Sequence, residues 1–193
     1  MNVTAEKTLL QKRETAVEEL YKKLYETKEK AEIVNGRIVT MPPTGYERGI
    51  ASHIITNELR KYARQSNFGF GVPDNVAFKV NLPHRKSFSP DSAFHIGKKS
   101  GMKFLEGAPV FAVEVRSEND YGEKAEKAMA EKRADYFAAG IKIVWDVDLL
   151  SDEVIKSYAR ENPSEPRVFR RGETADAEPA LPGWRMPVDE LFE

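Results

Sequence analysis

Two short apolar runs on either side of one helical segment constrain the fold of this chain more than any other feature. The runs are residues 110–115 and 143–147, and the residues between them carry a helical pattern over 123–139 that Gly140 ends. Glycine tolerates the left-handed conformation that often follows the last turn of a helix. Further short strands are predicted at 76–80, at 88–96, at 154–159 and around Val168. Strands before and after this helix predict a mixed α/β sheet within one domain.

Two more elements are predicted between the N-terminus and this unit. Residues 32–39 hold two β-branched runs that flank Asn35-Gly36. Because Asn-Gly is favoured in two-residue type I′ turns, the pattern predicts a β-hairpin. Residues 49–65 place apolar side chains on one side of a helix and are predicted to be helical.

The first thirty residues are predicted to form an amphipathic helix. Its apolar positions recur every three to four residues, at Leu10, Val17, Leu20, Tyr21 and Leu24. Such a helix can pack across its own domain, which we favour, or serve as a docking or dimerising arm. We therefore divide the chain into an N-terminal charged helix, residues 1–30, and a main domain, residues 31–193.

Charge excludes one class of nucleic-acid-binding protein. The 193 residues include 30 basic and 31 acidic side chains, so the formal net charge is −1. Domains that bind nucleic acid by bulk electrostatics usually have a pI above about 9, whereas this chain has a pI of about 6.4. Phosphate contacts must therefore come from a local basic patch. Lys124 and Lys127, on the helix at 123–139, are the best placed for this role.

The chain lacks the sequence marks of membrane and secreted proteins. No apolar run reaches the roughly 18 residues of a membrane span, and the N-terminus has no apolar signal-peptide core. Cysteine is absent, which excludes disulfides and thiolate zinc sites. We expect a cytoplasmic protein.

Asp91 and Glu114 are the first candidates for a chemical role. Glu114 lies inside the run 110–115, where alternate residues share a face, so Arg116 points the same way as Glu114. A carboxylate in a buried strand needs a compensating cation or hydrogen bonds. Glu114 could pair with Arg116 as a structural ion pair, or it could bind a divalent metal together with Asp91.

Lys132 lies within the apolar stripe of the helix at 123–139. Ala125, Met129, Lys132 and Tyr136 are spaced four, three and four residues apart and share one face. The ammonium group could extend to solvent over a buried stem. If the helix packs on the strand of Glu114, the same group could reach both carboxylates.

Other kinds of site find no support in the sequence. His53, His84 and His95 have no zinc-ligand spacing, and ordinary structural roles are expected for each. Phosphate-binding glycine loops and the Gly-x-Ser-x-Gly motif of hydrolases are absent from the sequence.

The order and spacing of several pieces resemble the PD-(D/E)XK nuclease superfamily, and within it the Uma-type group of restriction-endonuclease homologues. The resemblance runs from about residue 30 to near the C-terminus and rests on these segments: 32–45, Ser89-Pro90-Asp91, 107–117, 132–140, 143–148 and 181–184. It implies a restriction-endonuclease-like mixed β-sheet flanked by helices, to which the N-terminal helix is an addition.

The resemblance also implies a site. Asp91 and Glu114 would bind Mg²⁺ or Mn²⁺, Lys132 would be the family's lysine displaced onto the helix, and Glu32 would complete the catalytic set. The family's Ser and Asp after the second carboxylate match Ser117 and Asp120, for which closing a turn is the expected role.

Two positions depart from the family pattern. The superfamily's usual lysine position holds Arg116, and a position where the group commonly has histidine holds Arg48. Arginine cannot act as a base, but it can bind a phosphate. Either change fits a modified enzyme or a scaffold that is losing catalysis.

The favoured hypothesis is a divalent-metal-dependent endonuclease acting on DNA. The alternative is a catalytically weak or inactive nuclease fold that works by binding a partner or nucleic acid. Hydrolysis of another phosphodiester is a third hypothesis. Because nucleases that cut both strands often pair, the N-terminal helix offers a means of forming a homodimer.

Overall fold

The structure is a computed structural model, of which residues 3–192 are described, without the side chains of residues 3–6 and 8–10. Leu10, part of the apolar stripe predicted for the first helix, therefore lies outside the described side chains. No helix in the described range 3–192 has the length and apolar character needed to cross a membrane.

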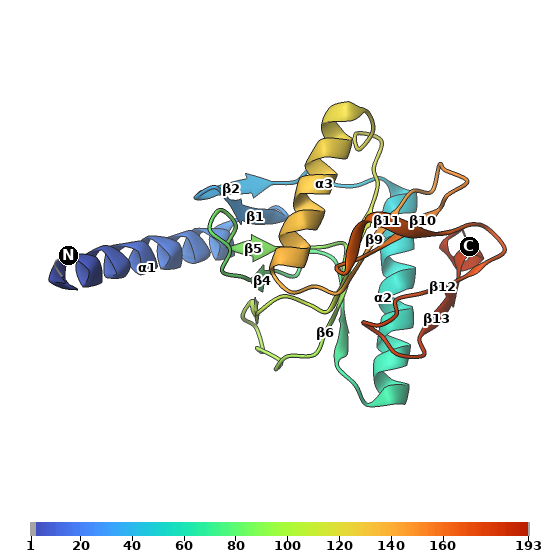
Figure 1. Ribbon diagram of the computed structural model, residues 1–193, viewed down its shortest axis with the longest axis horizontal. Coiled ribbons are helices and arrows are strands. Elements are labelled where there is room, and N and C mark those ends of the chain that lie inside the picture. The colour runs from blue at the N-terminus through green and yellow to red at the C-terminus, as the bar shows by residue number, and fades with distance from the viewer. Residues whose placement is uncertain (1–2, 193) are drawn as a thin grey trace.

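A six-stranded sheet forms the centre of the molecule, in the order β11-β10-β9-β8-β6-β3 (Figure 1). In chain order these strands are β3 (Phe70–Val72), β6 (Ser92–His95), β8 (Phe111–Val115), β9 (Ile143–Val147), β10 (Ile155–Ala159) and β11 (Asn162–Phe169). Strands β8 and β9 pair in parallel, and the other neighbours pair antiparallel. The sheet is therefore mixed, as the sequence predicts.

The parallel pair is joined by helix α3 (Glu123–Ala138). Parallel neighbours need a crossover connection, and a helix is the usual one. Gly140 follows the helix with a φ of 101°, in the conformation expected for a glycine at this position. The unit predicted from residues 110–147 is confirmed to within a residue or two at each boundary.

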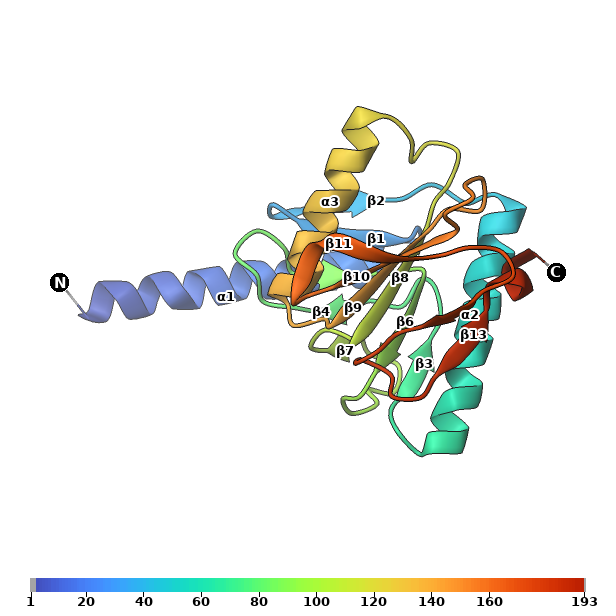
Figure 2. The same cartoon turned by 45° about the vertical axis from the view of Figure 1, so that its right-hand side comes forward.

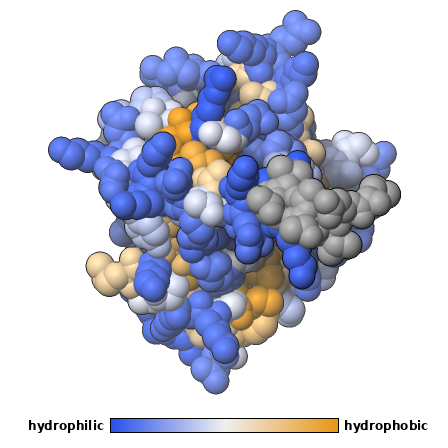
Figure 3. Space-filling model, turned by 90° about the vertical axis from the view of Figure 1, so that its left-hand side faces the viewer, coloured by the Kyte–Doolittle hydropathy of each residue, from blue (hydrophilic) through white to orange (hydrophobic). Residues whose placement is uncertain are grey.

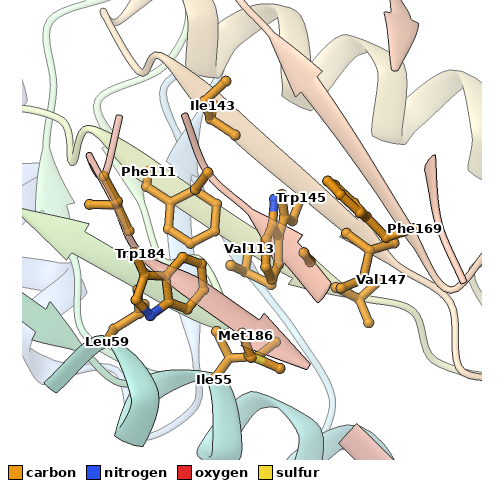
Figure 4. Packing of buried hydrophobic residues seen from close by; sticks show 14 of the residues in the cluster. Ile55, Leu59, Phe111, Val113, Ile143, Trp145, Val147, Phe169, Trp184 and Met186 are labelled. Carbon is orange, nitrogen blue, oxygen red and sulfur yellow. The ribbon is translucent and has the colours of Figure 1, made fainter. Parts of the chain in front are cut away.

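Helix α2 (Tyr46–Ser66) and the C-terminal segment cover one face of the sheet, and α3 covers the other (Figure 2). On the first face Phe111 of β8 packs edge-on against Trp145 of β9, and Trp184 lies beside both (Figure 4). On the second face Tyr136 and Phe137 of α3 are buried. Successive side chains of β8 therefore point to opposite faces of the sheet, as the sequence predicts.

The predicted hairpin is formed by β1 (Ala31–Val34) and β2 (Arg37–Thr40). Asn35 and Gly36 both have positive φ angles, 51° and 69°, as a type I′ turn requires.

The strand predicted at 88–96 is wrong in its extent. It is divided into β5 (Ser87–Phe88) and β6, and β5 joins a separate small sheet with β4 (Phe78–Lys79) and β7 (Leu105–Glu106). Pro90 lies at the break, where it has no N–H to continue a ladder. The break places Asp91 just before the first residue of β6.

The C-terminal tail adds two strands and a short helix that the sequence did not predict. These are β12 (Thr174–Asp176), β13 (Arg185–Pro187) and the 3₁₀ helix η1 (Val188–Phe192). Met186 and Leu191 bring them into the same core as Trp184.

Helix α1 (Val3–Glu26) points away from the body of the molecule and contacts it through its C-terminal half (Figures 1 and 2). Tyr21 and Leu24 are buried against Ala31 and Ile33 of the hairpin. The interpretation of this segment as a helix packed on its own domain is confirmed for this half.

Candidate active site

A groove of about 1210 Å³ lies beside α3 and the ends of β8 and β9. Its wall includes Glu114, Lys132 and Tyr136, together with the first turn of α2 and the loop after β8. Ala125 and Met129 of α3 also face this groove. The stripe that contains Lys132 therefore lines a concave surface.

Asp91 is held at the side of β8. Its side chain is 1% exposed, and its Oδ2 accepts a hydrogen bond of 2.8 Å from the backbone N–H of Val115. Its own N–H donates to the carbonyl of Val113, and its carbonyl accepts from the hydroxyl of Ser52. These bonds fix the carboxylate beside the strand that carries Glu114.

Two cations neutralise Asp91. Lys30 Nζ lies 2.6 Å from Oδ1, and Arg48 Nη2 lies 2.8 Å from Oδ1 and 2.7 Å from Oδ2. Burial acts to raise the pKa of Asp91, but Lys30, Arg48 and the Val115 N–H together lower it below its ordinary value. Asp91 is thus ionised at neutral pH.

Glu114 has a different electrostatic environment. Lys132 Nζ lies 2.9 Å from its Oε1, and the hydroxyl of Tyr136 donates to the same oxygen. Burial and the charges of Asp91 and Glu32 raise the pKa of Glu114, and Lys132 offsets this only in part. The three carboxylates lie close together, because Lys132 contacts both Glu114 and Glu32 and Asp91 accepts from the N–H of the residue after Glu114.

Lys132 connects Glu114 to Glu32. Its Nζ lies 3.2 Å from Oε1 of Glu32, and the Lys132 side chain is 20% exposed. Burial acts to lower the pKa of Lys132, but the charges of Glu114 and Glu32 raise it, so the ammonium stays protonated at neutral pH. The structure thus brings Asp91, Glu114, Lys132 and Glu32 into one region.

Glu32 is fixed by groups that the sequence did not reveal. Arg85 pairs with its Oε2, and the N–H of Ser89 donates to its Oε1 at 2.9 Å. Arg85 is in turn held by Asp135 of α3, which also accepts from His84. Burial acts to raise the pKa of Glu32, but Lys132, Arg85 and the Ser89 N–H lower it.

Arg116 does not serve as the counter-ion of Glu114. Its guanidinium makes two hydrogen bonds of 2.8 Å to Asp146 of β9 and also pairs with Glu126 of α3. Glu114 therefore pairs with Lys132, and the structural ion pair with Arg116 that the sequence suggested is not formed. With its side chain 8% exposed, Arg116 ties the end of β8 to β9 and α3.

Ser117 and Asp120 close the turn after β8, as expected. Oδ2 of Asp120 accepts from both the N–H and the hydroxyl of Ser117, each at 2.7 Å. The Asp120 N–H returns a hydrogen bond to the Ser117 carbonyl. This turn leads the chain from β8 to the start of α3.

The predicted basic patch does not coincide with the groove. Lys124 and Lys127 are exposed on α3 but lie outside the groove wall. The wall contains seven acidic and six basic side chains, so its formal charge is nearly balanced. A phosphate entering the groove would meet the individual cations of the wall in a nearly neutral surrounding.

The histidines have structural roles, as expected. His84 pairs with Asp135, His53 contacts Asn57 on the surface, and His95 is buried between Phe70 and Phe78. Within residues 3–192, no group of three or more His, Asp or Glu side chains is arranged to hold a metal.

Asp91 and Glu114 fit a divalent cation in their chemistry. Mg²⁺ prefers hard oxygen ligands and is often bound by only one or two carboxylates together with water and substrate phosphate. Asp91, however, already accepts four contacts from Lys30, Arg48 and Val115, which fill the roughly four acceptor positions of a carboxylate. A cation bound by this pair would therefore have to displace one of these partners from Asp91.

Lys30, Arg85 and the hydroxyl of Tyr136 are site residues that sequence reasoning missed. Lys30 directly precedes the hairpin, and Arg85 lies in the polar loop before β5, so neither has a periodic pattern to mark it. Only the position of Tyr136 in the stripe of Lys132 pointed toward the site.

Comparison with solved structures supports the architecture. A chain described as a "putative nuclease belonging to DUF820", from Anabaena variabilis, aligns with a TM-score of 0.67. The alignment covers 88% of this chain and 94% of that one, at 13% sequence identity. At this identity the likeness establishes the fold. No match was found among curated proteins.

The family comparison covers most of the chain. The profile of a family described as "Uma2: Putative restriction endonuclease" matches residues 17–189. The match begins within α1, before the point near residue 30 where the resemblance in the sequence began. The carboxylates and lysine described above all lie inside the matched range. This chain belongs to the Uma2 family.

Proposed function

We propose that this chain is an endonuclease that hydrolyses phosphodiester bonds of DNA, with Mg²⁺ or Mn²⁺ held by Asp91 and Glu114. The observation that carries the proposal is the convergence of Glu114 and Lys132 at the wall of one groove, with Asp91 buried next to them against the N–H of Val115. Glu32 joins them through Lys132. Membership of the Uma2 family supports a nuclease activity.

Each side chain has a defined part in this proposal. A bound divalent ion would lower the pKa of a water molecule and withdraw charge from the phosphate. Lys132, kept protonated by Glu114 and Glu32, stabilises negative charge on the reacting phosphate and does not act as a base. Both contacts to Glu114 within the described structure fall on Oε1, which leaves Oε2 to face a cation.

The charge of the groove supports a requirement for metal. Its nearly balanced wall provides little attraction for a polyanion. A divalent cation would add positive charge at the point where the phosphate has to bind, as Mg²⁺ does in many phosphate-processing sites.

Cleavage of supercoiled plasmid tests this function. In Mg²⁺ or Mn²⁺ the wild-type protein should produce nicked or linear DNA, and Asp91→Asn and Lys132→Met should each reduce the rate by about a hundredfold or more, as loss of one preorganised electrostatic contact does. Asp152→Asn and Lys156→Met are matched controls that lie outside the groove wall and should keep wild-type rates. Circular dichroism verifies that each variant folds.

Equal cleavage by the wild type and Asp91→Asn would contradict the proposal, since it would indicate a contaminating nuclease. Absence of cleavage by the wild type with Mg²⁺, Mn²⁺, Co²⁺ and Ni²⁺ would contradict it as well.

A second function is favoured by the contacts of Asp91. Because Lys30 and Arg48 neutralise this carboxylate, the chain could be a catalytically weak member of its family that binds nucleic acid or a partner. DNA binding by the wild type without cleavage, measured by fluorescence anisotropy in the same buffers, would support this function over the first.

A further inference from the structure

Arg48 contacts the oxygens beside which a cation at Asp91 would have to bind. Its Nη2 reaches both oxygens of Asp91, and its Nε donates to the backbone carbonyl of Val115 at 2.5 Å. One guanidinium therefore engages two carboxylate oxygens and a carbonyl oxygen. These are the hard oxygen donors that Mg²⁺ and Mn²⁺ use.

The two cations on Asp91 are not equally held. Lys30 also pairs with Asp74 at 2.5 Å, and its side chain is 12% exposed. Arg48 is 19% exposed, lies in the first turn of α2, and has Asp91 as its described carboxylate partner. Arg48 occupies two acceptor positions of Asp91 and the Val115 carbonyl, whereas Lys30 occupies one position of Asp91, so departure of Arg48 frees more oxygen donors.

A guanidinium and a metal ion cannot use the same acceptor positions at once. The four contacts to Asp91 fill its oxygens, so a divalent ion has to displace at least one donor. Arginine stays charged under all ordinary conditions and cannot vacate the position by losing a proton. Competition between Arg48 and the metal is then a matter of relative affinity.

We propose that Arg48 is the resident counter-ion of Asp91 and determines how strongly the site binds a divalent cation. Metal binding requires Arg48 to move away from Asp91 and Val115. The inference rests on the proposed function, because it concerns the metal site of the same reaction.

Titration calorimetry with Mn²⁺ on the full chain tests this role. Arg48→Ala should bind Mn²⁺ about tenfold or more tightly than the wild type, within the range of typical coupling between ligands. Arg64→Ala, an exposed arginine later on the same helix, should match the wild type. The double variant Arg48→Ala with Asp91→Asn should lose the gain, which locates the ion at Asp91.

A second measurement protects the test against a folding defect. Mn²⁺ should raise the thermal unfolding midpoint of Arg48→Ala more than that of the wild type, because a ligand stabilises the state that binds it. If circular dichroism shows that Arg48→Ala is unfolded, Arg48→Gln, which keeps a polar side chain but lacks the charge and the Nη atoms that reach Asp91, replaces it in both experiments.

Equal Mn²⁺ affinity of the wild type and the Arg48 variants would overturn the role of Arg48 and leave the proposed metal-dependent nuclease intact. Absence of Mn²⁺ binding in every variant would overturn the role of Arg48 too. In that case plasmid cleavage still decides separately whether the chain is a nuclease.

Discussion

Tyr136 combines a packing role with a role at the site. Its ring is fully buried and lies 4.4 Å, centroid to centroid, from that of Phe88. Its hydroxyl donates to Glu114, which satisfies a polar atom inside the core and orients the carboxylate. Buried tyrosines commonly find a hydrogen-bond partner in this way. A position that belongs to an apolar stripe in the sequence can thus also shape a site.

His95 is predicted to make stability depend on pH. It is 3% exposed, and neither ring nitrogen makes a hydrogen bond of good geometry within the described residues. Burial lowers the pKa of His95, and the backbone of Ala108 opposes this only in part. Between the lowered pKa and the ordinary value of about 6.5, the unfolded chain binds the proton more readily. The free energy of unfolding should therefore be largest above about pH 6.5 and decrease as the pH falls.

Urea denaturation from pH 8 to pH 5 measures this effect. His95→Leu removes the titrating ring, so its stability should decrease less over this range than that of the wild type. Comparing the two proteins also cancels Glu114, whose raised pKa acts in the opposite direction. His53→Gln, on the surface of α2, should behave like the wild type. Identical pH profiles for wild type and His95→Leu would refute the prediction.

Among the elements, α3 depends on the glycine that follows it. A Cβ at Gly140 would meet no atom within 4 Å, so an alanine there would be strained only by the φ of 101°. A left-handed backbone costs a residue with a Cβ about 1–2 kcal/mol. Gly140→Ala should lower the free energy of unfolding by this amount, as measured by urea denaturation.

Gly49 provides the matched comparison. It lies inside α2, where a Cβ would be 3.8 Å from Thr44 Cγ2, an ordinary contact. Glycine within a helix is less stable than alanine by about 0.5–1 kcal/mol, so Gly49→Ala should raise the free energy of unfolding. If both substitutions changed the free energy of unfolding in the same direction, the different backbone conformations of the two glycines would not be the cause.

For the whole molecule, α1 divides into a packed half and a projecting half. Tyr21 donates a hydrogen bond to the carbonyl of Lys86, and Tyr25 stacks on Phe104 with ring centroids 3.7 Å apart. Figure 3 looks from the side toward which α1 projects, and the coloured surface there is mostly hydrophilic with small separate hydrophobic patches. Packing on the body thus involves the second half of the helix.

Truncation should separate these halves. Deleting residues 1–15 should change the free energy of unfolding by less than about 1 kcal/mol, since the described side chains that it removes, at positions 7 and 11–15, are exposed. Deleting 1–26 should lower it by more than about 3 kcal/mol, because the buried side chains of Tyr21 and Leu24 each contribute about 1.5–3 kcal/mol. Thermal and urea unfolding measure both changes.

Light scattering on the same truncated proteins tests the dimerising arm, which remains a prediction. If the projecting half mediates a homodimer, the protein without residues 1–15 should be a monomer of unchanged stability. A full chain that is itself monomeric at high concentration would exclude that role.

The sequence alone determined the elements whose signals are local. The hairpin at Asn35-Gly36, the unit from β8 through α3 to β9, and the stripe containing Lys132 follow from turn chemistry and periodicity. Asp91, Glu114, Lys132 and Glu32 were singled out by motif order, and the structure places them together.

Only the tertiary structure decided which charges pair. Arg116 is two residues from Glu114 yet binds Asp146 and Glu126, and Lys30 and Arg48 reach Asp91 from segments about sixty and forty positions earlier. The pairing of β4 with β7, and the packing of Met186 and Leu191 into the core with Phe111, likewise depend on partners far along the chain. Local patterns specify backbone conformation because they depend on neighbouring residues. Ion pairs depend on which segments the folded core brings into contact, and short-range sequence patterns do not specify those contacts.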